Sequence, residues 1–129
     1  MRGAHSVRLV DVVNGLRASV DRRIRVLIVR RRLEEHAATL VERATGKRPK
    51  QHRVVPRRLM LLTADMPTQQ WATAHGLARR AATVYSDTST VLHSNRAFGD
   101  IPEHLVQEWE QVTADVEEAI NQPVQDQPT

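Results

Sequence analysis

The chain has 129 residues, a formal net charge of +4 and no cysteine, so it fits one domain and can form neither a disulfide nor a thiolate site. Aromatic residues make up 3% of the chain, which leaves an aliphatic core and favours helices packed on helices over a sheet sandwich. The first residues lack the apolar segment of a signal peptide, and the longest apolar run has four residues, too few to cross a membrane. We therefore expect a soluble, cytoplasmic, all-α protein.

Charge is sorted along the chain. Residues 1–58 carry 16 basic and 5 acidic side chains, whereas residues 101–129 carry 7 acidic side chains and no basic one. Such an asymmetry indicates an electrostatic partner for each end. The partner of the basic end is either the acidic C-terminal helix of the same or a neighbouring chain, or a nucleic acid. Of the 19 cationic residues 17 are arginine, which suits phosphate recognition, although the coding bias of a GC-rich prokaryotic genome explains it more simply.

Residues 7–44 predict one long basic amphipathic helix, which follows a disordered lead at residues 1–6 and ends at Gly46 and Pro49. A strand at residues 23–30 is the less favoured alternative. Two apolar stripes, offset by part of a turn, run along the helix at spacings of mostly three and four residues. The first stripe is Leu9, Val13, Leu16, Val20, Ile24 and Leu27, and the second is Val26, Leu33, Ala37, Leu40 and Ala44. A helix of about 55 Å is too long for a small domain to cover, so we expect a homodimer or a long hairpin partner.

Residues 47–58 contain two prolines and six basic residues and lack apolar periodicity. We interpret them as a basic linker inside a single helical domain of residues 7–121, either a solvated connection or an arm that lies along phosphates. The candidate phosphate ligands of this linker are Arg48, Lys50, Arg53, Arg57 and Arg58. The apolar run at residues 59–64 fits a helical turn or a short strand.

Residues 68–85 resemble the helix-turn-helix pattern of bacterial DNA-binding regulators. Ala72 and Gly76 have the spacing of the small residue and the turn glycine, although His75 and Ala82 depart from the usual aliphatic residues. The resemblance covers about 18 of the 129 residues. It implies a second helix from about residue 78 that presents side chains to the major groove, namely Arg79, Arg80 and Thr83. One alanine-rich core helix that tolerates a glycine is the simpler and favoured interpretation of the same residues.

Residues 100–120 predict the C-terminal helix, with Asp100 and Glu103 as a capping box and a disordered tail at residues 122–129. Its heptad-like stripe, together with the first stripe of the N-terminal helix, forms the predicted interface. The interface residues are Leu9, Val13, Leu16, Val20, Leu27, Leu105, Trp109, Val112 and Val116. We expect the two terminal helices to pack antiparallel, with opposite charges along their edges.

Catalytic and metal-binding patterns are missing from the sequence. No two of the six histidines lie three to five residues apart, which excludes the common helical zinc pairs. The chain contains no nucleophile elbow, no phosphate-binding loop and no dinucleotide fingerprint. We therefore expect no cofactor and no metal, and an enzyme is the least favoured interpretation. Membrane-surface binding by the basic helix is also disfavoured, because the helix lacks aromatic anchors.

The leading hypothesis is a small non-enzymatic regulator that binds nucleic acid through the basic linker and residues 68–85. The alternative is a helical interaction or assembly protein, such as a partner-binding inhibitor or a structural subunit. One continuous exposed stripe of linker arginines with Arg79 and Arg80 would favour nucleic acid. Pairing of the N-terminal arginines with the C-terminal glutamates would favour the interaction protein.

Overall fold

The computed structural model describes residues 2–94 and 101–122, and the side chains of residues 8–94 and 101–122. All elements in these ranges are helical, which confirms the all-α prediction. In chain order they are α1 (Arg2–Thr45), α2 (Val55–Leu59), η1 (Met60–Leu62), η2 (Thr68–Gln70), α3 (Trp71–His93) and α4 (Glu103–Asn121). The helix α1 begins at Arg2, within the residues 1–6 that we expected as a lead. The predicted tail beyond Gln122 and the cap Asp100 lie outside the described residues.

The helix α1 ends where the sequence predicts. Gly46 adopts φ +79°, a left-handed conformation that glycine takes without steric cost. Its amide donates to the carbonyl of Glu42 at 2.7 Å, and this bond satisfies one of the last free carbonyls of the helix. The 44 residues of α1 make a rod of about 66 Å.

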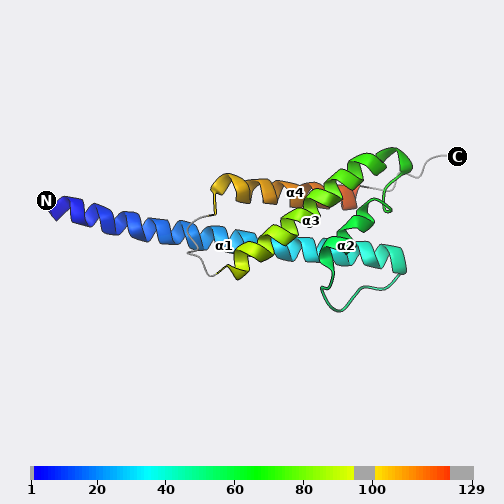
Figure 1. Ribbon diagram of the computed structural model, residues 1–129, viewed down its shortest axis with the longest axis horizontal. Coiled ribbons are helices and arrows are strands. Elements are labelled where there is room, and N and C mark those ends of the chain that lie inside the picture. Colours follow the sequence, from blue (N-terminus) through cyan, green and yellow to red (C-terminus); the bar gives the residue numbers. More distant parts are fainter. Residues whose placement is uncertain (1, 95–100, 123–129) are drawn as a thin grey trace.

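The core sits on the C-terminal half of α1, where α2, α3 and α4 pack against it. The second apolar stripe of α1 is buried there except for Ala44, which is exposed. Aliphatic residues of the other helices, Tyr85 and Trp109 complete the core. The N-terminal half of α1 extends as a single helix beyond the other elements (Figure 1). The first apolar stripe is therefore exposed, with Leu9 63% and Leu16 62% accessible.

The helices α1 and α4 run parallel, which corrects the antiparallel prediction (Figure 1). Arg25 contacts Glu103 and Glu110, and Arg32, seven residues later, contacts Glu117. Both series ascend in the same direction. The reason lies in the connection, because α3 runs back along α1 and so returns the chain to the starting end before α4 begins.

The α1–α4 pairing has the register of a parallel coiled coil. Five buried residues of α4 are spaced alternately three and four apart, namely Val106, Trp109, Thr113, Val116 and Ile120. Glu103, Glu110 and Glu117 therefore occupy one flanking position of three successive heptads. Arg25 and Arg32 flank the core of α1 in the same way. Pairs of this kind fix the orientation and register of parallel helices, and their hydrogen bonds from arginine lower the pKa of Glu103 and of Glu117. The expected packing of the basic helix against the acidic helix is thus confirmed, with Arg25 and Arg32 making the ion pairs.

The helix α3 is continuous through Gly76, so the turn of the predicted helix-turn-helix is absent. Gly76 has no positive φ, and a Cβ there would meet only the Arg80 side chain, at 3.8 Å. The buried alanines on the opposite side, Ala74, Ala78 and Ala81, let α3 lie close to its neighbours. Close helix packing on this face therefore overrides the turn that the Ala–Gly spacing indicates. Trp71 stays 47% exposed.

The linker is shorter than predicted. Residues 55–59 form α2, whose Val55 and Leu59 are buried, and the apolar run that follows is a 3-10 turn and not a strand. Val54, which precedes α2, takes the left-handed conformation at φ 46°, a rare one for a β-branched residue. The segment 46–54 is the part that remains a connection.

Candidate nucleic-acid interface

An open groove runs between α2 and the middle of α3. Among the residues that the structure describes, its lining contains no carboxylate. The lining residues are Pro56, Arg57, Met60, His75, Arg79, Ala82 and Thr83. Arginines stand on both walls, so the groove favours an anion.

Buried apolar residues fix the positions of the two walls of the groove, which are α2 and α3. Val55 and Leu59 are 2% and 1% exposed and hold α2 against the core, so Arg57 between them faces outward. On α3, Ala78 and Ala81 are completely buried. Arg79 and Thr83 follow on the exposed side of the same helix, one turn apart. The predicted ligands Arg57, Arg79 and Thr83 therefore meet in this groove.

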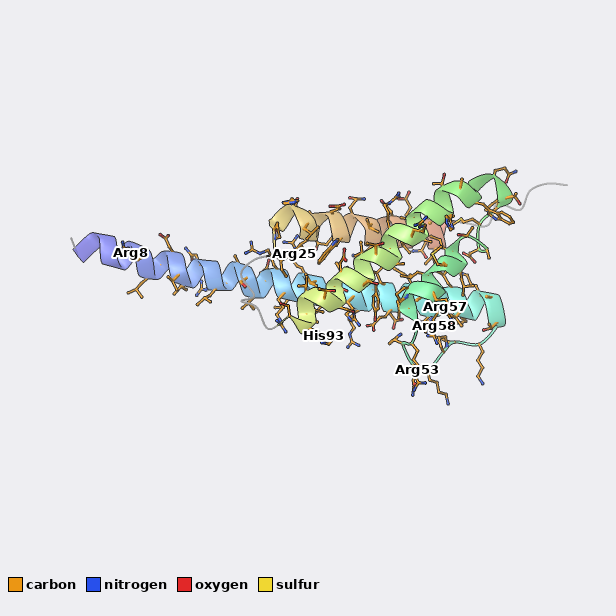
Figure 2. All side chains as sticks on the ribbon, viewed as in Figure 1. Arg8, Arg25, Arg53, Arg57, Arg58 and His93 are labelled. Carbon is orange, nitrogen blue, oxygen red and sulfur yellow. The ribbon has the colours of Figure 1, made fainter. Side chains whose placement is uncertain are left out.

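The connection 46–54 adds cations beside the groove. Lys50 and Arg53 are exposed, and Figure 2 shows Arg53 pointing away from the helices, below Arg57 and Arg58. Arg58 donates from Nη1 to the carbonyl of Gln51 at 2.8 Å and so braces the connection. Arg53, Arg57 and Arg58 thus lie at the same edge of the molecule (Figure 2).

Two other predicted ligands face carboxylates instead. Arg48 turns back onto α1, where it contacts Glu42 and Glu35, and these hydrogen bonds, that of Glu42 first, raise its pKa. Arg80 lies on the α4 side of α3 and borders two hollows, one with Asp115 and Glu118 and one with Asp87 and Glu108. Arg79 and Thr83 border the second hollow as well. Neither Arg48 nor Arg80 lines the cationic groove.

Sequence reasoning missed His75. A turn at Gly76 would have placed His75 and Arg79 on different helices, so their common face was invisible. In a continuous helix, residues 75, 79, 82 and 83 share one side at the helical period. The interpretation of residues 68–85 as one uninterrupted helix places His75 on the same face as Arg79, and would have identified it.

The predicted interface residues divide between two environments. Trp109, Val112 and Val116 lie in the core of their own chain, and Leu105 packs against that core. They are thus closed to a partner, because α1 and α3 already cover them. The α1 members, namely Leu9, Val13, Leu16, Val20 and Leu27, remain exposed.

A polar cluster joins α1 to α3 but has the character of a packing contact. The Arg30 guanidinium lies 4.1 Å from the centre of the Tyr85 ring, and it also donates to Ser89. The Tyr85 hydroxyl donates to Glu34 at 3.1 Å, and burial raises the pKa of Tyr85. Cation–π contact and hydrogen bonds here hold the two helices together.

Metal clusters and membrane-spanning helices are absent from the described part of the chain. No three His, Asp or Glu side chains there gather as a metal site, and none of its helices has the length and apolarity to span a bilayer. Comparison of the sequence with protein-family models and curated proteins, and of the fold with solved structures, gives no match.

Proposed function

We propose that the chain is a non-enzymatic nucleic-acid-binding protein that holds the phosphate backbone in the groove between α2 and α3. The observation that carries this proposal is the cationic lining by Arg57 and Arg79, with His75 and Thr83 beside them and no carboxylate among the described lining residues. The edge cations Lys50 and Arg53 extend the positive surface.

The ion pairs between α1 and α4 are those expected of an interaction protein, and they leave the arginines of the groove outside the pairing. Glu103, Glu110 and Glu117 are engaged by arginines of α1, so much of the acidic charge of α4 is neutralised within the fold. Arg57 and Arg79 make no ion pair with the described residues, although Arg79 also borders the hollow that contains Asp87 and Glu108. A polyanion gains most where positive charge is left uncompensated and exposed.

The contacts would be made to phosphates more than to bases. A guanidinium offers a planar fork that matches phosphate oxygens, and the Thr83 hydroxyl can donate one further hydrogen bond. Because α3 is one uninterrupted helix, residues 68–85 do not form the recognition unit that would read base edges. We therefore propose binding with weak sequence preference, since phosphate contacts position a protein without reading sequence.

The neighbouring residues Arg79 and Arg80 provide a matched pair of variants. Binding of the full chain to a random duplex is followed by fluorescence anisotropy between ~50 and ~200 mM salt, where several phosphate contacts give a steep loss of affinity. Arg79→Ala should weaken binding and reduce the salt slope by about 0.9, the value for one lost phosphate contact. Arg80→Ala removes the same charge on the α4 side and should leave the slope almost unchanged.

Two results would contradict the proposal. One is the absence of binding at the lowest salt. The other is an equal loss for the two variants, which would mean that only net charge matters and the groove does not.

The alternative of a helical interaction or assembly protein rests on a different observation. The first stripe of α1 leaves large aliphatic side chains exposed, and contiguous apolar surface of this kind marks protein contacts. The two functions use separate surfaces and do not exclude each other.

A further inference from the structure

The largest apolar surface of the described chain lies on the projecting half of α1. We define the α1 stripe as six side chains that are 43–63% exposed, with Val10, Val13 and Ile28 beside them. Its members are Leu9, Val12, Leu16, Val20, Ile24 and Leu27. These nine residues leave on the order of 500 Å² of apolar surface, near the upper end for the largest patch of a typical monomer.

This surface belongs to a different side of α1 from the core. At 3.6 residues per turn, Val26 and Val29 point into the core, whereas Ile24 and Leu27 point away from it. The exposures agree, because Val26 and Val29 are 0% and 1% exposed and Leu27 is 43% exposed. The helices that cover the core side therefore leave the α1 stripe open.

The spacing of the α1 stripe is a palindrome. Its residues follow one another at intervals of 3, 4, 4, 4 and 3 positions, which read the same in both directions about Ala18. Two copies of α1 placed antiparallel about this point bring Leu9 level with Leu27 of the other copy, Val12 with Ile24, and Leu16 with Val20. Each of the six members then meets an apolar residue, whereas Val13 and Ile28 beside the stripe come level with Arg23 and Arg8. The contacts are reciprocal, as an isologous two-fold interface requires.

The charges beside the stripe complement each other in the same arrangement. Arg17 and Asp21 border the apolar surface on one side, and neither makes an ion pair with the described residues. In an antiparallel pair the same side of both helices meets, so Arg17 of each copy comes near Asp21 of the other, twice. A parallel pair would instead bring Arg23 and Arg31 close to their own counterparts.

We infer that the α1 stripe is the self-association surface of this chain, and that it pairs two copies antiparallel about Ala18. The core helices of each copy then lie at opposite ends, so they do not collide. With the flanking residues, the buried area approaches the ~800 Å² per partner of a standard interface. The inference names a second copy of this chain as the partner in the alternative function of an assembly protein. It does not depend on the nucleic-acid proposal.

The first test measures molar mass in solution. Light scattering on the full chain, up to ~100 µM to include weak association, should give twice the mass of the 14.6 kDa monomer. Leu16→Glu should give the monomer, because it places a charge in the paired stripe. Ala18→Glu adds the same charge on the opposite, exposed side of α1 and should leave the dimer intact. A monomeric wild type overturns the inference. Binding of the wild type to anionic lipid vesicles as a monomer, without dimer formation in solution, overturns it as well.

The second test fixes the direction of pairing. The chain has no cysteine, so Leu9→Cys and Leu27→Cys each introduce one reactive thiol. In the antiparallel pair, mixing the two variants should form a disulfide between them under mild oxidation. Each variant alone should form none, because like thiols lie about 27 Å apart along the axis, far beyond disulfide reach. Efficient crosslinking of Leu9→Cys with itself would show a parallel pair and overturn the inference.

The ion pairs allow a charge exchange. Arg17→Asp sets four carboxylates together across the two-fold axis, and Asp21→Arg sets four guanidinium groups together there, so each variant should weaken the dimer. The double variant restores the complementarity and should recover most of the lost affinity, measured as the dissociation constant in sedimentation. Additive losses in the double variant would contradict the proposed geometry. These variants leave the groove between α2 and α3 untouched, so failure of self-association and failure of nucleic-acid binding are distinguishable.

Discussion

Leucine-to-alanine substitutions in the two apolar stripes of α1 should have very different costs. Leu33 is completely buried, whereas Leu16 is 62% exposed. Both substitutions are made in a Val20→Glu background, which removes self-association and leaves only the stability of the single chain. Val20 is itself 57% exposed, so the fold tolerates this background.

The expected magnitudes follow from burial. Leu33→Ala removes three methylene equivalents at about 0.8 kcal/mol each and leaves a cavity, which brings the loss of unfolding free energy to about 3–4 kcal/mol. Leu16→Ala loses about two-fifths of the same transfer energy, ~1 kcal/mol, and creates no cavity. The higher helix propensity of alanine offsets part of that loss, by a few tenths of a kcal/mol.

Urea unfolding followed by far-UV circular dichroism measures both values. Fluorescence gives a second reading, because Trp109 is buried in the core. Equal losses for the two variants would refute the assignment of one stripe to the core and the other to the surface. So would a loss below ~1.5 kcal/mol for Leu33→Ala, since full burial alone demands more.

Two further predictions concern the core and the entry to α2. Burial, partly opposed by Glu117, lowers the pKa of His36 below 6.5. On acidification the unfolded chain therefore binds the proton before the folded chain does, and the free energy of unfolding should fall as the pH drops from about 6.5 toward the folded pKa. His36→Gln should flatten this part of the pH profile of stability, measured by urea unfolding. An unchanged profile would contradict the assignment. Val54→Gly should raise the free energy of unfolding by about 0.5–1 kcal/mol, because it relieves ~1–2 kcal/mol of left-handed strain at a smaller entropic cost. Val54→Ala keeps the Cβ and should give no such gain, so equal stabilisation by alanine in thermal unfolding would refute the strain.

The candidate groove was only partly foreseeable. Arg57, Arg79 and Thr83 were predicted as ligands from charge and from a motif whose turn does not form. They lie together because α2 folds back along α3, which no local pattern in residues 47–58 announces. Arg48 and Arg80 have the same side chain as the predicted ligands of the groove. In the fold, however, Arg48 pairs with Glu35 and Glu42, and Arg80 borders a hollow toward α4 that contains carboxylates.

Local patterns in the sequence were sufficient for the helical class, the end of α1 at Gly46 and the existence of two stripes on α1. Glycine, proline and the 3.6-residue period act within a few residues, so their effect is readable without neighbours. The separation of basic and acidic residues along the chain likewise indicated α4 as one of the two candidate partners of α1.

Tertiary structure decided which stripe became core, in which direction α4 runs and which arginines stay uncompensated. Two apolar faces of one helix are equivalent until other elements reach one of them, and α3 and α4 return only as far as the C-terminal half of α1 (Figure 1). The same return makes α4 parallel to α1, so that Arg25 and Arg32 find glutamates there. Burial and ion pairing are properties of the assembled helices, because they depend on contacts between residues far apart in the chain.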